Sequence, residues 1–275
     1  MISLHSLKLS VAGRTAMIAL DHGKANEMGR DQIGEWEAVA EWLEGGEVSA
    51  LITFSRRVSA KGSPIFIAGA NVTERAGWTL DEVKAHVRRQ RAALVRLRAA
   101  PVFHAAVVHG IALGWGTEFL IACDYRIAAP QARFGLPETG LGILPGAGGS
   151  SELATIIGPN QALRLGMTGE LIRADEALRI GLVDEVAPTL DQALERAQKL
   201  ADNVALRSPT AVAAFKRAVL AGMGNSADVR REIEARAYEH CADSGEAAVG
   251  RANFAEITAG TAFLAPWGPY RRWEA

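Results

Sequence analysis

Short apolar runs alternate with amphipathic stretches along the first two thirds of the chain. The segments SLKLSV and TAMIAL are rich in β-forming residues and partly alternate, and Ala12-Gly13-Arg14 between them has the composition of a turn. Three further runs are almost continuously apolar, which is typical of strands buried on both faces. They are VSALITFS (48–55), IFIAGA (65–70) and VFHAAVV (102–108).

Two stretches between these runs have the apolar spacing of helices. In QIGEWEAVAEWLEGG the residues Ile33, Trp36, Val39, Ala40 and Leu43 recur at helical intervals, and two glycines end the pattern. The second stretch begins at residue 79 and ends near residue 100. Its start, Thr79 followed by Glu82, predicts a capping box.

The second helical stretch has one basic face. We expect this face to be a solvated surface rather than an anion site, although the sequence leaves both open. Its members are Lys84, Arg88, Arg89, Arg91, Arg96 and Arg98.

The pattern changes near Pro188. Strands alternating with helices before this point predict a mixed α/β body, whereas three amphipathic segments with Thr or Ser starts predict helices after it. We therefore divide the chain into a core of residues 1–188 and a C-terminal helical section of residues 189–275. The last part of that section is an extended tail.

Composition excludes several classes of protein. A net charge of −1 argues against a nucleic-acid binder, because such proteins neutralise phosphates with surplus Lys and Arg. Only two cysteines are present, without ligand-like spacing, so we expect no metal site and a reducing compartment. No apolar run approaches the roughly 20 residues of a membrane helix, and the N-terminus has no signal-peptide pattern. We expect a cytoplasmic protein that binds neither membranes nor nucleic acids.

Glycines gather beside apolar strands in three segments, at residues 65–72, 109–120 and 136–153. Glycine after a strand lets backbone N–H groups approach a ligand oxygen. If a helix starts near Trp115, its free N–H groups form an oxyanion site, and Glu118 lies in its first turn. Glu138 follows Pro137 in a segment that we expect to be a loop.

Two carboxylates in apolar, glycine-rich surroundings indicate general acid–base chemistry, because burial and a neighbouring carboxylate both raise a carboxyl pKa. A structural interpretation competes with this one. Glu118 would then cap a helix and Glu138 would lie in a surface turn. Other sites are poorly supported, since GAGGSS (146–151) lacks the last glycine of a dinucleotide fingerprint and no GxSxG elbow is present. We expect His104 and His109 to be structural.

The same three segments resemble the crotonase superfamily, the enoyl-CoA hydratase/isomerase group. IFIAGANV resembles the Phe-x-Ala-Gly-Ala-Asp stretch of that family, and HGIALGWGTEFLIACDYRIAAPQARFGLPETGLGILPGAGGSSEL resembles its central signature. MTGELIRADEALRIGLVDEV resembles the segment that follows, and LDHGKANEM resembles an Asn-containing loop near the N-terminus. The similarity is strong over residues 65–187.

The resemblance implies a spiral of repeated ββα units with C-terminal helices that build trimers, often paired into hexamers. It implies an acyl-CoA substrate and no cofactor other than the coenzyme A of that substrate. Glu118 and Glu138 match the two hydratase carboxylates, and the backbone N–H groups of Ala70 and Trp115 match the oxyanion hole. The positions that the resemblance assigns to coenzyme A or substrate are Lys24, Ala25, Asn26, Ala68, Gly69, Asn71 and Gly116.

Three departures from the family pattern keep other functions open. Trp115 stands where the family has a glycine, Asn71 replaces the usual Asp, and an aromatic tail follows Glu256. We expect this tail to pack on a neighbouring subunit or over the active-site mouth. A hydratase is the main prediction. An isomerase, a hydrolase, or a tailoring enzyme acting on another thioester or a diketone is the alternative, and a non-catalytic assembly protein is a third.

Overall fold

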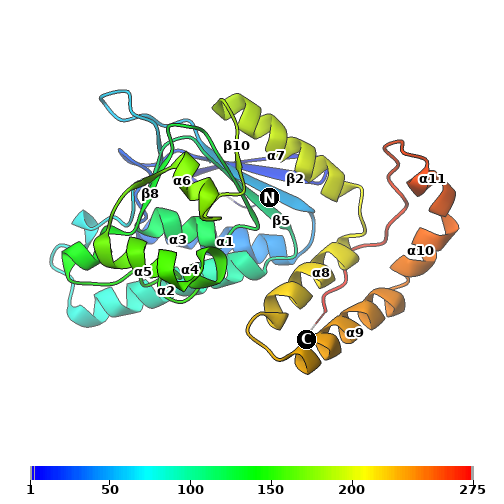
Figure 1. Cartoon of the computed structure of the whole chain (residues 1–275). Coiled ribbons are helices and arrows are strands. Elements are labelled where there is room, and N and C mark those ends of the chain that lie inside the picture. Colours follow the sequence, from blue (N-terminus) through cyan, green and yellow to red (C-terminus); the bar gives the residue numbers. More distant parts are fainter. Residues whose placement is uncertain (1, 3, 274–275) are drawn as a thin grey trace.

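Six strands form the main sheet of the computed structural model, which describes residue 2 and residues 4–273 (Figure 1). The first two strands are antiparallel and every later neighbour is parallel. In spatial order the strands are β1 (Leu7–Ala12), β2 (Thr15–Leu20), β3 (Ala50–Ser55), β5 (Phe103–Val108), β7 (Tyr125–Ala128) and β10 (Glu185–Val186).

A second, smaller sheet takes the strands that lie between these in the sequence. Its pairs are parallel except for the last, and its strands are β4 (Ile65–Ile67), β6 (Ile111–Leu113), β8 (Arg133–Gly135) and β9 (Ile172–Arg173). The chain thus runs from one sheet to the other and then into a helix, and it repeats this path. The order β3–β4–α2 followed by β5–β6–α3 is the repeated ββα unit that the resemblance predicted.

Helices cover both faces of the main sheet (Figure 1). The helices of the core are α1 (Arg30–Glu44), α2 (Leu80–Ala99), α3 (Trp115–Ile121), α4 (Leu153–Ile157), α5 (Pro159–Thr168), α6 (Ala174–Arg179) and α7 (Leu190–Ala205). Two 3₁₀ turns, η1 (Thr73–Arg75) and η2 (Pro137–Leu141), complete this part.

Alternate residues of the central strands enter two different cores. In β5, Ala106 and Val108 join the core of α1 and α2, while Ala105 and Val107 join the core of α7. The helix α7 approaches the sheet through a stripe of small residues, Ala193, Ala197 and Ala201. Because both faces are covered, these strands are apolar throughout, as their sequences indicated.

The predicted helix starts are correct. The Thr79 hydroxyl oxygen accepts a hydrogen bond from the backbone N–H of Glu82, and the Glu82 carboxylate accepts one from the backbone N–H of Thr79. The capping box is therefore present. Thr189, Ser208 and Ser226 likewise cap α7, α8 and α9.

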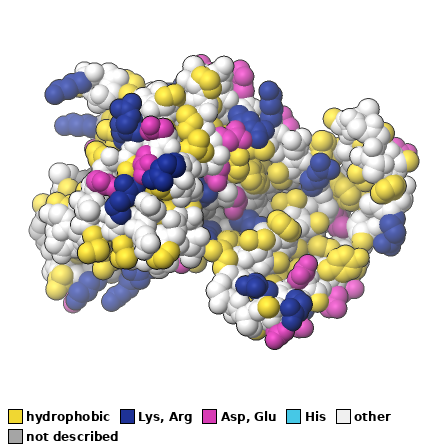
Figure 2. Space-filling model, in the orientation of Figure 1, with side chains coloured by type: hydrophobic (Ala, Val, Ile, Leu, Met, Phe, Trp, Pro, Cys, Tyr) yellow, Lys and Arg dark blue, Asp and Glu magenta, His cyan; other side chains and the backbone are white. Residues whose placement is uncertain are grey.

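The C-terminal helices extend away from the core as an arm (Figure 1). They are α8 (Pro209–Gly222), α9 (Ala227–Asp243), α10 (Glu246–Ala252) and α11 (Phe254–Thr258). Hydrophobic side chains cover part of this arm (Figure 2), and both Phe215 and Tyr238 are more than 70 % exposed. The division at residue 188 remains a prediction; α7, which follows it, packs on the sheet of the core.

The aromatic tail runs back along the helices of its own chain. Its expected contact with a neighbouring subunit or the active-site mouth stays a prediction. Trp273 is buried against Ala214 and Ala237, and the Trp267 indole N–H donates to the Leu206 carbonyl at 3.0 Å. Small residues on α8 and α9 leave room for the Trp273 ring, which explains why the tail packs there.

In the described part of the chain, none of the helices combines the length and the apolarity that crossing a membrane requires.

Candidate active site

The start of α3 is fixed to the ends of two strands. Gly114 adopts φ 50° and ψ −118°, a conformation open to glycine, and its N–H donates to the Gly135 carbonyl. The Thr117 hydroxyl lies within hydrogen-bond distance of the Ala112 and Gly135 carbonyls, at 2.8 and 3.0 Å. These bonds hold the first turn of α3, and therefore Glu118, at the edge shared by β6 and β8.

Glu118 is buried and its carboxylate is held by backbone. Only 4 % of the residue is exposed, and Oε1 accepts hydrogen bonds from the N–H groups of Ala147 (2.6 Å) and Gly149 (3.0 Å). Burial raises the pKa of Glu118, whereas these two bonds and the charge of Arg91 act against the rise. A Cβ at Gly149 would lie 2.5 Å from the Pro145 Cβ, so this loop requires glycine there.

Glu138 lies in η2 rather than in the loop that we expected. Pro137 occupies the first position of this 3₁₀ turn, which suits its fixed φ. Among the described residues, Oε2 of Glu138 is buried without a hydrogen-bond partner. Burial, supplemented by the negative charge of Glu118, raises the pKa of Glu138 to about 7.

The Glu138 carboxylate lies at the start of the helix that carries Glu118. A Cβ added to Gly114 would lie 2.7 Å from Oε1 of Glu138, so the Glu138 carboxylate lies directly against the residue that precedes α3. Glu118 comes one turn later on that helix. The structure therefore brings the two predicted catalytic residues together, although they are 20 positions apart in the sequence.

The two backbone N–H groups predicted to form the oxyanion hole lie shortly after β4 and at the start of α3. The Met28 N–H donates to the Gly69 carbonyl, and the Asn71 N–H donates to the Met28 carbonyl. The N–H of Ala70, which lies between these two bonds in the sequence, therefore points away from Met28. The N–H of Trp115 belongs to the first turn of α3, where no intrahelical acceptor exists. Within residues 4–273, neither N–H has a protein acceptor.

A close contact brings these two donors toward each other. A Cβ at Gly116 would lie 2.3 Å from the Ile67 carbonyl oxygen, so only glycine lets α3 approach the end of β4. Gly116 was predicted to contact substrate. In the structure it is buried against β4, where it permits the approach of the chain that carries Ala70.

The Trp115 side chain packs into the core. It is 2 % exposed, and its ring centroid lies 5.6 Å from that of Phe119, which also contacts Trp36 at 4.8 Å. The indole N–H has no hydrogen-bond partner in the part of the chain that the structure describes. The unusual tryptophan thus leaves its backbone N–H free, while its ring extends the aromatic core beside the site.

The residues predicted to bind coenzyme A lie on two adjacent segments. The Ala68 N–H donates to the Ala25 carbonyl at 3.0 Å, which joins the loop of Lys24 to the segment that ends at Asn71. Lys24 is exposed and Ala25 and Ala68 are half-buried.

The two asparagines of this pair of segments make internal bonds. Asn26 is buried at a positive φ of 54°, and its amide donates to Ser55 Oγ and the Phe66 carbonyl. Asn71 Oδ1 accepts hydrogen bonds from the Thr73 hydroxyl and the Glu74 N–H, which fix it to η1. Both side chains shape the segments, and Lys24 remains the exposed cation.

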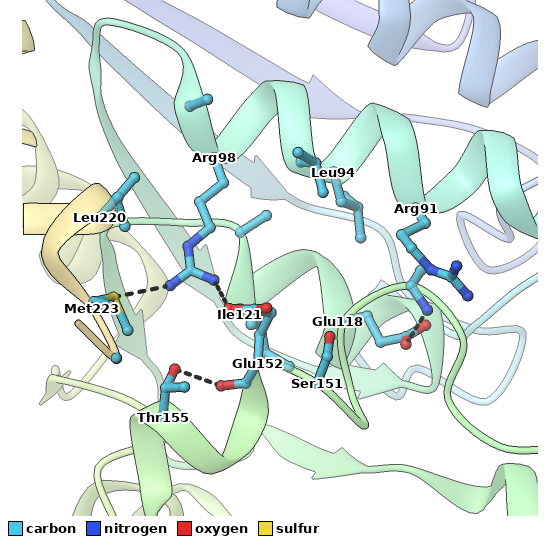
Figure 3. A pocket seen from close by; sticks show the side chains of 16 residues that line it. Arg91, Leu94, Arg98, Glu118, Ile121, Ser151, Glu152, Thr155, Leu220 and Met223 are labelled. Atoms are coloured by element: carbon cyan, nitrogen blue, oxygen red, sulfur yellow. Dashed lines mark hydrogen bonds and ion pairs between the residues drawn. The ribbon is translucent and has the colours of Figure 1, made fainter. Parts of the chain in front are cut away.

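A cavity of about 600 Å³ adjoins Glu118 (Figure 3). It lies between α2, α3, the loop of residues 145–152 and the end of α8. Its apolar walls include Leu94, Ile121, Leu220 and Met223. The sequence did not single out this cavity, because its walls come from four separate segments.

Sequence comparison places the chain in a known family. The family model described as enoyl-CoA hydratase/isomerase matches residues 58–260. The chain belongs to the enoyl-CoA hydratase/isomerase family. The short-chain-enoyl-CoA hydratase of Clostridium acetobutylicum is 34 % identical over 242 residues, which cover 87 % of this chain and 90 % of that protein. The crotonyl-CoA hydratase of Syntrophomonas wolfei is 33 % identical over 247 residues, or 88 % and 92 % of the two chains.

Solved structures of the enoyl-CoA hydratase/isomerase family agree with this assignment. The enoyl-CoA hydratase from Bacillus anthracis superposes with a TM-score of 0.86 at 30 % identity, covering 96 % of this chain and 99 % of that chain. The predicted crotonase-like α/β fold is confirmed. The relatives are enoyl-CoA hydratases, which are hydro-lyases, and the prediction of an enzyme of this type is confirmed as well.

Proposed function

We propose that this enzyme adds water across the 2,3 double bond of an enoyl-CoA thioester, with Glu118 and Glu138 as its two acid–base groups. One observation carries the proposal: two carboxylates with opposite surroundings lie together beside two free backbone N–H groups. Glu118 accepts two N–H bonds, which favour its charged form, whereas the buried Oε2 of Glu138 has no partner among the described residues.

The thioester carbonyl accepts hydrogen bonds from the N–H groups of Ala70 and Trp115. The Glu118 carboxylate removes a proton from water while the water oxygen forms a bond to C3. The π electrons of the double bond move toward C2 and the carbonyl, and the two N–H groups stabilise the negative oxygen that results. Protonated Glu138 donates its proton to C2, and proton exchange with solvent restores both carboxyl groups.

The test is the hydration of crotonyl-CoA, followed by loss of the conjugated-thioester absorbance. The singly substituted variants Glu118→Gln and Glu138→Gln should each lose roughly 10²- to 10⁴-fold in kcat. Glu195→Gln is the matched control, because Glu195 is exposed on α7. Unchanged rates in either active-site variant would contradict the assigned roles.

Coenzyme A is proposed to lie along the loop of Lys24 and the segment from Ala68 to Asn71. Lys24 offers an exposed positive charge to a phosphate. Lys24→Ala should raise KM for crotonyl-CoA several-fold and leave kcat unchanged, with Lys61→Ala as the control. A failure of calorimetry to detect binding of any acyl-CoA would favour the alternative, a fold relative that acts on another carrier or a free substrate.

The trimer or hexamer predicted from the resemblance is also part of the proposal. The exposed Phe215 and Tyr238 on the arm support it, because large apolar side chains that gather on a surface mark interaction sites. Sedimentation should give a trimer or a multiple of it, and Phe215→Asp should shift the mass toward the monomer. The cytoplasmic location stays a prediction.

A further inference from the structure

The loop that holds Glu118 is itself held by an arginine of α2. Arg91 Nε donates to the Gly146 carbonyl at 2.8 Å. The next residue, Ala147, and then Gly149 donate their N–H groups to Glu118. A continuous set of hydrogen bonds therefore runs from Arg91 through this loop to the carboxylate, and Figure 3 shows the Arg91 side chain extending from α2 beside Glu118.

Arg91 differs from the three arginines of its helix that form ion pairs. Arg89 is paired with Glu37, Arg96 with Glu44 and Arg98 with Glu152. Arg91 instead bonds an uncharged carbonyl, so its positive charge is not neutralised by that contact. It also lines the same cavity as Glu118.

Few other charges face Glu118. From α2 and the start of α4, Arg98 and Glu152 form a pair at 2.6 Å, whose charges compensate each other. From η2, Glu138 acts on Glu118 only when it is itself ionised. Leu220 of α8 and Met223, which follows this helix, also line the cavity and carry no charge. Arg91 is therefore the cation that opposes the burial of Glu118, and its charge lowers the pKa of that carboxyl.

We propose that Arg91 is a positioning residue of the hydration site, which fixes the loop of residues 146–149 and supplies the positive charge that favours the Glu118 carboxylate. This inference rests on the proposed hydratase function. It explains how two neighbouring glutamates can divide the roles of acid and base: Glu118 has two backbone donors from the loop and a cation, whereas Glu138 has only its own N–H and a neighbouring carboxylate. Without Arg91, the pKa of Glu118 would rise further, and a smaller fraction of Glu118 would be ionised at a given pH.

Three substitutions separate the two contributions of Arg91. Gln places its amide nitrogen at the same distance along the side chain as Arg Nε, so Arg91→Gln keeps the donor and removes the charge. Arg91→Lys keeps the charge, and Arg91→Leu removes both. Arg88→Gln is the control, because Arg88 is exposed one turn earlier on the same helix.

The acid limb of the pH profile of kcat/KM for crotonyl-CoA is the decisive measurement. Removing a positive charge disfavours the carboxylate, so this limb should move to higher pH in Arg91→Gln and Arg91→Leu, by up to about one unit. Arg91→Lys and Arg88→Gln should keep the wild-type limb. Arg91→Leu should also lose roughly tenfold in kcat on the alkaline side of this limb, because the loop is no longer fixed.

A titration without substrate separates this inference from the proposed function. Infrared difference spectra follow carboxyl ionisation, and Glu118→Gln identifies the band of Glu118. The band should titrate at higher pH in Arg91→Gln than in the wild type. An unmoved band would overturn the inference even in an active hydratase, whereas a shifted band in a protein that does not hydrate crotonyl-CoA would overturn the proposed function alone.

Discussion

The first turn of α3 and the 3₁₀ turn η2 each contribute one glutamate to the same site, yet the two carboxylates have different hydrogen-bond partners and neighbouring charges. In α3, Glu118 accepts two backbone N–H groups and lies near Arg91. In η2, Oε2 of Glu138 is buried without a hydrogen-bond partner in the described part of the chain, and the charge of Glu118 raises the pKa of Glu138 further. Burial thus raises the pKa of both carboxyls, while two backbone donors and the charge of Arg91 oppose the rise at Glu118.

This difference has a mechanistic consequence. A hydration needs one group that takes a proton from water and one that gives a proton to carbon. If both carboxyls had the same surroundings, their coupled titration would leave the roles exchangeable. Burial raises the pKa of both carboxyls here, so the proposed assignment of Glu118 as the base rests on its two loop donors and on Arg91, and that of Glu138 as the acid on its buried Oε2 and the nearby charge of Glu118.

The largest expected effect comes from removing both carboxylates. If they act on the same water, the variant that carries both Glu118→Gln and Glu138→Gln should be little slower than the slower single variant, because groups that act as a unit are strongly non-additive. Single-turnover rates with crotonyl-CoA measure this. Losses that multiply across the two positions would show that the carboxylates act independently, and would break the comparison.

A smaller effect should follow from crowding the point where the two turns meet. A Cβ at Gly114 would lie 2.7 Å from Oε1 of Glu138, so Gly114→Ala should displace that carboxylate and lower kcat roughly 100-fold. It should also cost about 1–3 kcal/mol of folding free energy, because φ is positive there.

Gly13→Ala is the control for the backbone cost of that substitution. Gly13 also has a positive φ, and no heavy atom lies within 4 Å of its added Cβ. Thermal unfolding and kinetics of both variants should show a loss of stability in each and a loss of activity in Gly114→Ala alone. Equal activities would mean that Gly114 does not set the position of Glu138.

The sequence predicted those features that depend on local chemistry. The strands, the Thr79 capping box and the start of α3 follow from periodicity and side-chain bonding over a few residues. The resemblance added the pairing of Glu118 with Glu138, which depends on contacts between distant segments. Neither the local sequence patterns nor the resemblance predicted that the surroundings of Glu118 and Glu138 differ.

What escaped prediction depends on long-range contacts. Arg91 was one of six basic residues on a helix, and nothing local distinguishes the one that reaches the Gly146 carbonyl. We expected the tail on a neighbour or at the site because its aromatic side chains need cover, and the sequence did not indicate that Trp273 packs on Ala214 and Ala237 of its own chain. Alanines such as these do not indicate in the sequence that a tryptophan ring packs on them.

The pH dependence of activity is the next sharpest test of the comparison. Because burial raises the pKa of Glu138 to about 7, its acidic form should decline above that pH in the free enzyme. The kcat/KM for crotonyl-CoA should therefore fall as pH rises through about 7. The substrate for this measurement should dissociate faster than it reacts. A value of kcat/KM that stays constant up to pH 9 would then contradict the role of Glu138 as the acid.

The smallest expected effect is on stability. The folded pKa of Glu138, about 7, lies above its ordinary value of 4.5, so the folded state binds more protons between these values. This stabilising contribution is complete below pH 4.5 and is lost as pH rises through about 7. Glu138→Gln cannot ionise, so its free energy of unfolding should exceed that of the wild type by about 1–2 kcal/mol at pH 8, after allowance for solvent screening. The two proteins should converge near pH 4.5. Urea unfolding at both pH values measures the difference, and the same substitution at Glu118 should give a smaller gain or a loss, because its carboxylate already has donors.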